Sequence, residues 1–243
     1  MRMLEEADEY LIRKLLNAHS KTALEALYLE IGVIPIRYVI MNRRLGYLHH
    51  VLNMNEHELI HRVYTAQKRK PIKDDWINAI DSDKDKLGIN ENDNELKHIK
   101  KNQFKAKIKS KIRDKAFQDL NKRKSTHSKV QDIHYGSYAK QKYMSDKNFT
   151  QKDIDLLFKL RTNMISDVKM NFKGMYDLCK EDIPQTQAHL TQCNKIIDNC
   201  PQLFDNIDVE YEDIYAEPEK QLKITKLFRK ILETRDKLME DLP

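Results

Sequence analysis

The chain has 243 residues, of which 34% are charged and 40% hydrophobic, and it contains only five glycines and six prolines. This composition argues against a β-sandwich, which needs many turn residues, and favours long helices with polar surfaces. The net charge of +6 permits a polyanionic partner, while the mean hydropathy of −0.75 and the lack of a run of about 18 apolar residues lead us to expect no membrane span.

Helical periodicity marks the first part of the chain. A first helix with one apolar face is predicted by four residues at helical spacing, Leu4, Ala7, Leu11 and Leu15. Thr22 and Glu25 have the spacing of a capping box, which predicts the start of a second helix, and Gly32 is placed to end it. Pro35 suits the first turn of a third helix, which is the most apolar segment of the chain.

Two further helices complete the first 83 residues. Asn55 is suited to cap a fourth helix, with Glu58 at its third position, and a short helix is expected around Trp76. The polar segment 84–94 is predicted to be a loop and a boundary between lobes. We therefore expect a first domain at residues 1–83.

A strongly basic helix is predicted to follow, over residues 95–124. Together with a later helix capped by Thr150 and Asp153, it makes up a predicted basic linker domain at residues 95–165. A third part, residues 170–243, holds the cysteines and ends in an amphipathic helix. Since no strand pair is evident, the expected fold is all-α, an irregular helical bundle with two lobes.

Ten basic residues are candidates for contacts with a nucleic-acid backbone, because a dense and poorly neutralised cationic face binds phosphates by releasing counterions. They are Arg37, Arg43, Arg44, Lys101, Lys105, Lys109, Arg113, Lys122, Arg123 and Lys124. The alternative for the lysines is the solvated face of a surface helix, at whose end positive charge also complements the helix dipole. For the three arginines, side chains whose stems flank a core helix are the simpler interpretation.

The segment LCKEDIPQTQAHLTQC, residues 178–193, has part of the spacing of a zinc knuckle. His189 and Cys193 lie one turn apart if the segment is helical, and Cys179 is available as a third ligand. A closed structural site needs a fourth ligand, for which Cys200 is the remaining cysteine. Ordinary buried cysteines with an exposed histidine are the alternative.

The number of cysteines also bears on the compartment. Three are too few for a disulfide framework, and an odd number is typical of a reducing environment. We therefore expect an intracellular protein of the nucleus or cytoplasm.

Several segments, taken in order, resemble the region after the polymerase core in reverse transcriptases of non-LTR retrotransposons. They are LIRKLLNAHSKTALEALYLEIGVIPIRYVIMNRRLGYLHHVL, ELIHRVYTAQKRKPIKDDW, and LLFKLRTNMISDVKMNFKGMYDLC followed by HLTQC. The resemblance implies a thumb-like helical module at 1–83 and a basic linker after it. It also implies a knuckle to which Cys179, His189 and Cys193 would contribute the second, third and fourth ligands.

The chain departs from this family pattern in ways that limit the expected function. Tyr176 stands where the first knuckle cysteine is expected, so the knuckle would be degenerate and would bind zinc weakly or not at all. The polymerase core and the endonuclease signature are absent, so no catalytic residue is predicted.

The expected function is that of a non-catalytic nucleic-acid-binding fragment of a retrotransposon polyprotein. It would contact the backbone of RNA or DNA and, in the parent protein, the missing polymerase core. The alternative is a helical protein-interaction or scaffold protein derived from such a fragment.

Overall fold

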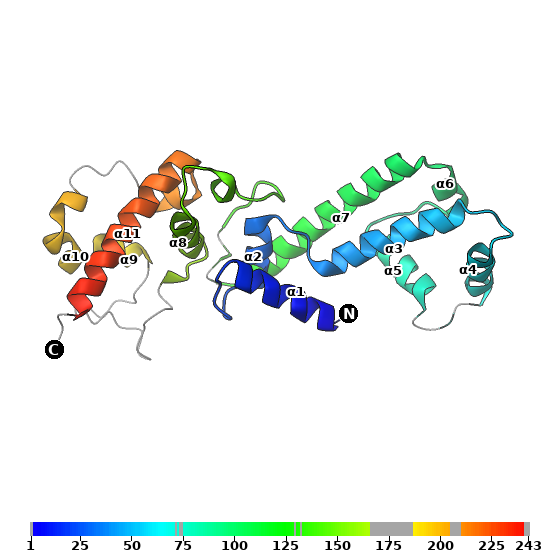
Figure 1. Cartoon of the computed structure of the whole chain (residues 1–243), viewed down its shortest axis with the longest axis horizontal. Helices are drawn as coiled ribbons and strands as arrows, with labels where there is room; N and C mark the ends of the chain where they lie inside the picture. Colours follow the sequence, from blue (N-terminus) through cyan, green and yellow to red (C-terminus); the bar gives the residue numbers. More distant parts are fainter. Residues whose placement is uncertain are drawn as a thin grey trace. The chain divides into compact units, whose positions relative to one another are not determined.

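All the regular secondary structure in the part of the chain that the structure describes is helical (Figure 1). A computed structural model describes residues 2–70, 72, 75–128, 130–131, 133–165, 187–204 and 210–240. Eleven α-helices and several short 3-10 helices, but no strand, occur among these residues, which confirms the predicted all-α class. None of the described helices combines the length with the apolar composition that crossing a bilayer would require.

The chain divides into two compact units, each made of separate stretches of sequence. The first unit combines Met1–Tyr10 with Val33–Lys122, and the second combines Leu11–Gly32 with Arg123–Pro243. The predicted domains are contiguous instead, because local periodicity gives no sign of a segment that packs with a distant part of the chain. The boundary predicted between 165 and 170 borders residues 166–186, which lie outside the described part.

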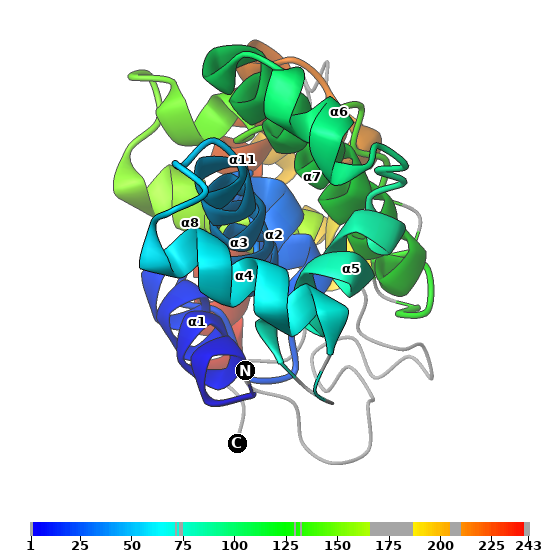
Figure 2. The ribbon, with the colours of Figure 1, turned by 90° about the vertical axis from the view of Figure 1, so that its right-hand side faces the viewer.

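In the first unit, α3 (Ile36–Leu52) is the central helix. Its buried side chains recur every three or four positions and form one apolar face, which includes Tyr38, Met41, Leu45, Leu48 and Leu52. Three helices contact α3 and gather around its C-terminal half (Figure 1 and Figure 2), namely α4 (Leu59–Arg69), α5 (Trp76–Lys86) and α6 (Asp93–His98).

The long helix α7 (Lys101–Lys124) lies beside α3 and runs in the opposite direction (Figure 1). Near the start of α3, the Tyr38 hydroxyl donates to Asp119 Oδ2 at 2.6 Å. Near the end of α3, the ring of His49 stacks on the ring of Phe104, with the centroids 4.4 Å apart. Burial, together with the hydrogen bond to Asp119, raises the pKa of Tyr38 to about 12.

The basic segment predicted as one helix over 95–124 is two helices, α6 and α7, so this prediction is wrong at one point. Ile99 lies between them in an extended conformation, with φ −75° and ψ 127°. Its carbonyl oxygen lies 2.9 Å from His49 Nε2. Because a carbonyl only accepts, Nε2 is the donor. A partner on α3, which local periodicity does not reveal, thus stabilises the break.

A polar triad joins α4 to α6. The Tyr64 hydroxyl donates to Asp93 Oδ2 at 2.6 Å, and Lys68 forms an ion pair with the same carboxylate. Burial of Asp93 opposes ionisation, but the hydrogen bonds from Lys68 and Tyr64 outweigh it and hold the pKa of Asp93 below its usual value. Burial and the Asp93 carboxylate raise the pKa of Tyr64 above its usual value.

In the second unit, α8 (Gln151–Arg161) packs against α11 (Pro218–Glu240). The two helices share an apolar core with the 3-10 helices η1 (Lys142–Ser145) and η4 (Tyr211–Tyr215). The C-terminal amphipathic helix predicted from the sequence is therefore present as α11, which buries one apolar face in this core.

Three short helices complete the described part of the second unit, α9 (Gln187–Gln192), α10 (Asn194–Asn199) and η3 (Pro201–Leu203). The capping box predicted at the start of α8 is confirmed. The side chains of Thr150 and Asp153 each accept a hydrogen bond from the backbone N–H of the other.

The helix α2 (Leu24–Ile31) ends at Gly32, as predicted. Gly32 has a left-handed conformation with φ 64°, and a Cβ atom there would lie 2.3 Å from the backbone nitrogen of Lys140. The Gln141 N–H donates to the carbonyl oxygen of Glu30 at 3.0 Å, which holds this second segment against the end of α2. Both the backbone conformation and the close approach therefore require glycine.

Glu30, in the last turn of α2, is a charged residue with no exposed surface. Arg161 Nε donates to Glu30 Oε1 at 2.9 Å, and the hydroxyls of Tyr135 and Tyr143 donate to the carboxylate at 2.8 Å each. Arg161 also donates to the carbonyl of Ile214 at 2.8 Å. Burial and the charge of Glu30 raise the pKa of both tyrosines well above the usual value. One buried network thus connects α2, α8, η1 and η4.

The first helix, α1 (Arg2–Leu15), has the predicted conformation, but its predicted apolar face is exposed to solvent. Leu4, Leu11 and Leu15 are 54%, 62% and 73% exposed, whereas Ile12 is buried. A helical period identifies a face and does not show what covers it.

Two predicted helix starts differ from the structure. α2 has Ala23 at its N-cap, and the Thr22 hydroxyl donates to Met164 Sδ at 2.7 Å instead of capping the helix. α4 has Glu58 at its N-cap and begins four residues after Asn55. In both cases a side chain that is suited to cap a helix has another local or distant partner.

Replacing Glu30 with glutamine is expected to destabilise the second unit by about 3–5 kcal/mol, because it leaves the buried Arg161 guanidinium without a counter-charge. Chemical denaturation of the whole chain, followed by circular dichroism, measures this loss. Glu217→Gln is the matched control, since Glu217 pairs with Lys142 on the surface, where both side chains are at least 75% exposed. The control is expected to lose about 1 kcal/mol or less. Equal losses in the two variants would contradict the assigned role of Glu30.

Asp93 is expected to make the stability of the first unit sensitive to acid. Its pKa is lower in the folded chain than in the unfolded chain, so the ionised carboxylate stabilises the fold above about pH 4 and this contribution is lost below that value. Asp93→Asn should therefore be less stable than the wild type at pH 7, and the difference should shrink as the pH falls towards 3.

Urea denaturation at several pH values measures this difference. Tyr64→Phe, which removes one donor to the same carboxylate, is expected to show part of the effect. A difference between Asp93→Asn and the wild type that stays constant from pH 7 to 3 would show that the ionised form is not what stabilises the fold.

Candidate nucleic-acid interface

The helix α7 contains ten lysines and arginines but only two aspartates. Three of the lysines hold neighbouring groups in place: Lys107 pairs with Glu91, Lys111 donates to the carbonyls of Leu87 and Gly88, and Lys115 pairs with Asp119 at 3.1 Å. This part of the basic helix is therefore structural.

A second row of α7 cations is exposed. Lys101, Lys105, Lys109 and Arg113 follow one another at intervals of four residues and lie on one face of the helix. The three lysines form no ion pair with any residue in the described ranges. At 1.5 Å per residue this row is about 18 Å long. We call it the α7 cationic row.

The basic residues at the end of α7 have different environments. Lys124 is buried, and its Nζ donates to the carbonyls of Val130, Gln131 and Ile133 at 3.0, 2.7 and 2.6 Å. These three hydrogen bonds stabilise the turn that follows the helix. Because the ammonium group is buried, it is not accessible to phosphate. Lys122 and Arg123 are exposed.

The predicted arginines on α3 also differ from one another. Arg44 forms a bidentate ion pair with Asp83 at 2.8 and 3.0 Å, which joins α3 to α5. Arg37 lies over the ring of Tyr38, with its guanidinium carbon 4.9 Å from the ring centroid. Arg43 is exposed. Arg37 and Arg44 thus fit the structural interpretation considered for them.

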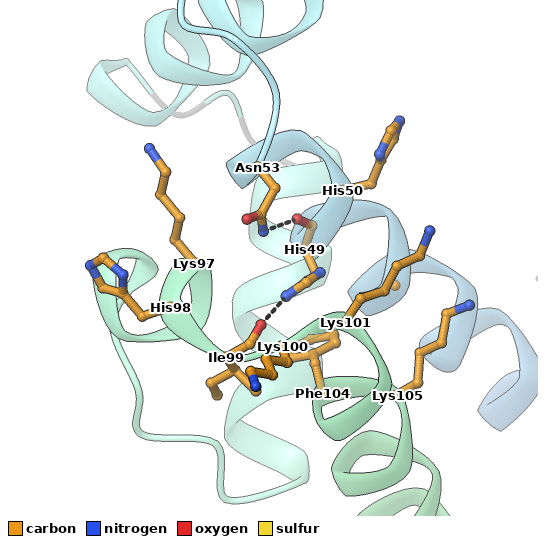
Figure 3. Close-up of a pocket in the computed structure, with 11 residues that line it drawn as sticks. His49, His50, Asn53, Lys97, His98, Ile99, Lys100, Lys101, Phe104 and Lys105 are labelled. Carbon is orange, nitrogen blue, oxygen red and sulfur yellow. Dashed lines mark hydrogen bonds between the residues drawn. The ribbon is translucent and has the colours of Figure 1, made fainter.

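The break between α6 and α7 opens a pocket that sequence analysis did not identify (Figure 3). Its volume is about 500 Å³. His49 and Phe104 are buried at its base, beside the half-buried Ile99. Asn53 Nδ2 donates to the carbonyl of His49 at 2.8 Å, which adds a further polar contact at the end of α3.

Six exposed basic side chains surround this base. They are Lys97, Lys100, Lys101, Lys105, His50 and His98. Figure 3 shows Lys97 and His98 on one side of the pocket and Lys101, Lys105 and His50 on the other, with His49 between the two groups. No aspartate or glutamate is among the lining residues that the structure describes. We call these residues the α6–α7 pocket; it contains the first two lysines of the α7 cationic row.

The predicted metal ligands lie apart from this interface in the sequence. Cys179 and Tyr176 lie outside the described residues. His189 and Cys193 are buried, and Cys193 belongs to the apolar core of the second unit. Cys200 Sγ lies 3.2 Å from Thr234 Oγ1. Among the described residues, no three histidine, cysteine or acidic side chains gather into a group that could hold a metal ion.

No protein-family model matches the chain, and neither a curated protein nor a solved structure matches it significantly. Support for a function therefore comes from the residues of the chain itself.

Proposed function

We propose that this chain is a non-catalytic nucleic-acid-binding module that contacts the phosphate backbone of RNA or DNA. The α7 cationic row supports this proposal most directly. Its lysines are exposed, evenly spaced and not neutralised by described acidic residues, and binding of a polyanion releases the counterions that would otherwise surround them. Contacts of this kind position a nucleic acid without reading its sequence.

The distribution of partners on α7 is what favours binding over a merely solvated helix. A surface helix usually intersperses glutamates with its lysines at a spacing of four residues. Two of the nearby acids are already paired, because Glu91 pairs with Lys107, and Asp119 accepts from Tyr38 and Lys115. The other aspartate of α7, Asp114, is exposed beside Arg113. Lys101, Lys105 and Lys109 thus form a row of positive charge on one face without described counter-charges. The resemblance to the region after a retrotransposon polymerase core is consistent with such a role. It also implies that, in a parent protein, this module would contact a polymerase core.

A helical protein-interaction or scaffold function is the second candidate. It is favoured by apolar side chains that α4 presents to solvent, since Leu59, Ile60 and Val63 are 74%, 42% and 46% exposed. Their spacing places them on one side of the helix, and exposed apolar patches mark surfaces that bind other proteins.

The nucleic-acid function predicts a steep salt dependence that originates in α7. With four phosphate contacts, the logarithm of the association constant for an RNA hairpin should fall with the logarithm of salt concentration with a slope of about −3.6. Lys105→Ala combined with Lys109→Ala should make this slope shallower by about 1.8. Fluorescence anisotropy titrations at several salt concentrations measure both quantities.

A matched control is offered by α11, where Lys226 and Lys230 are exposed and also four residues apart. The corresponding double alanine variant is expected to leave the slope unchanged. An affinity that does not depend on salt, or equal effects of the two double variants, would contradict an interface on α7.

The scaffold function predicts the opposite behaviour towards salt. Self-association through α4 would persist at 1 M salt, because burial of apolar surface is not screened. Leu59→Ser combined with Val63→Ser would abolish it while leaving the affinity for RNA intact. Size-exclusion chromatography with light scattering measures the mass of both proteins at low and high salt, and a monomer under all conditions would argue against this candidate.

A further inference from the structure

The α6–α7 pocket combines two surfaces that suit different parts of one ligand. Its base is formed by the stacked rings of His49 and Phe104, and its rim by exposed lysines and histidines. Its volume of about 500 Å³ is in the range of small-molecule sites. The double helix of a nucleic acid is too wide to enter such a cavity, whereas the last nucleotide of a strand is small enough.

The charges around the pocket are not balanced by acidic residues in the part of the chain that the structure describes. Lys97, Lys100, Lys101 and Lys105 form no ion pair with any described residue. The acidic residues of α6 are already used: Asp93 accepts from Lys68 and Tyr64, and Glu95 caps its own helix.

The local backbone increases this positive potential. Lys100 provides the first carbonyl of α7, which accepts from the Phe104 N–H at 2.9 Å, so it occupies the N-cap position, where a lysine side chain has no acceptor to offer. Lys100 and Lys101 thus lie at the positive end of the helix dipole, which is the unfavourable end for a cation. Bound negative charge would relieve the repulsion among these groups.

We propose that the α6–α7 pocket binds the phosphorylated end of a nucleic-acid strand. The terminal phosphate monoester would lie among the rim lysines, and the terminal nucleoside would lie over the floor of the pocket, which His49 and Phe104 form. A phosphate monoester carries a charge of about −1.5 to −2 at pH 7. It therefore gains more from a cluster of cations than an internal phosphodiester does. The α7 cationic row continues from the pocket through Lys109 and Arg113, so the rest of the strand would follow α7 away from its held end.

This inference rests on the proposed nucleic-acid function and deepens it, so its test separates the two. Three single-stranded oligonucleotides of identical sequence, each with an internal fluorescent label, carry a 5′-phosphate, a 3′-phosphate or hydroxyls at both ends. Anisotropy titrations of the full chain are expected to show about tenfold tighter binding of one phosphorylated oligonucleotide, the size of effect expected for one well-formed charged hydrogen bond. The comparison also shows which end is held, and competition by a free nucleoside monophosphate shows whether the pocket accepts the terminal group alone.

Two double variants assign the preference to the pocket. Lys97→Ala with Lys100→Ala should reduce the tenfold preference to about one, whereas Lys109→Ala with Arg113→Ala should weaken the binding of all three oligonucleotides by a similar factor and keep the preference. All the changed side chains are exposed, and thermal unfolding confirms that the variants are folded.

Each outcome bears on the proposal. Salt-dependent binding of all three oligonucleotides with equal affinity would overturn the pocket assignment and leave the proposed function intact. A preference that survives in Lys97→Ala with Lys100→Ala would place the end-binding site elsewhere and overturn the assignment. No binding of any oligonucleotide would overturn both proposals.

Discussion

The hydrogen bond between His49 and the carbonyl of Ile99 organises the α6–α7 pocket of the first unit. A backbone carbonyl released from a helix needs a new donor, and leaving it unpaired in a buried position costs about 1–3 kcal/mol. His49 donates this bond from α3 at 2.9 Å, and its ring also stacks on Phe104 in the first turn of α7. One side chain thus stabilises the break and fixes where the next helix begins, and the positions of Lys97, Lys100 and Lys101 follow from it.

The two units use their charged residues in different ways. In the second unit, the buried carboxylate of Glu30 has three donors, and the buried ammonium of Lys124 has three carbonyl acceptors. Such closed networks are costly to disrupt, and these two buried charges are not available to a partner. In the first unit, Lys101, Lys105 and Lys109 are exposed on one face without described counter-charges. The row of exposed lysines that supports the proposed nucleic-acid function lies in the first unit, whereas α11 of the second unit exposes Lys226 and Lys230.

Sequence periodicity predicted the helices well and their surroundings poorly. The helix containing Tyr38 to Leu52, the Thr150 capping box and the stop at Gly32 depend on local chemistry, so each could be predicted from neighbouring residues. The break at Ile99 could not, because its cause is a histidine 50 positions away in the sequence. The partners of Arg44 and Lys124 were missed for a similar reason, since charge composition does not show which cations are already neutralised.

One signal of the buried network was present in the sequence. Glu30 is followed by Ile31 and preceded by Leu29, at the end of a short helix whose only other charged residue is Glu25 in the first turn. An acidic residue at such a position is either exposed at the helix end or buried with partners of its own, and sequence alone does not distinguish these cases. The donors Tyr135, Tyr143 and Arg161 lie 105, 113 and 131 positions away in the sequence, so local patterns do not reveal that they contact this helix.

The way that binding responds to salt concentration distinguishes the two candidate functions better than the amino-acid composition does. The α7 cationic row and the exposed apolar side chains of α4 belong to the same unit, so either could carry the interaction. Binding through phosphates weakens as salt rises, because the released counterions must return to a more concentrated solution. Association through apolar surface is not weakened in this way. The sign of the salt response therefore identifies which chemical feature of the first unit is used, even before any residue is changed.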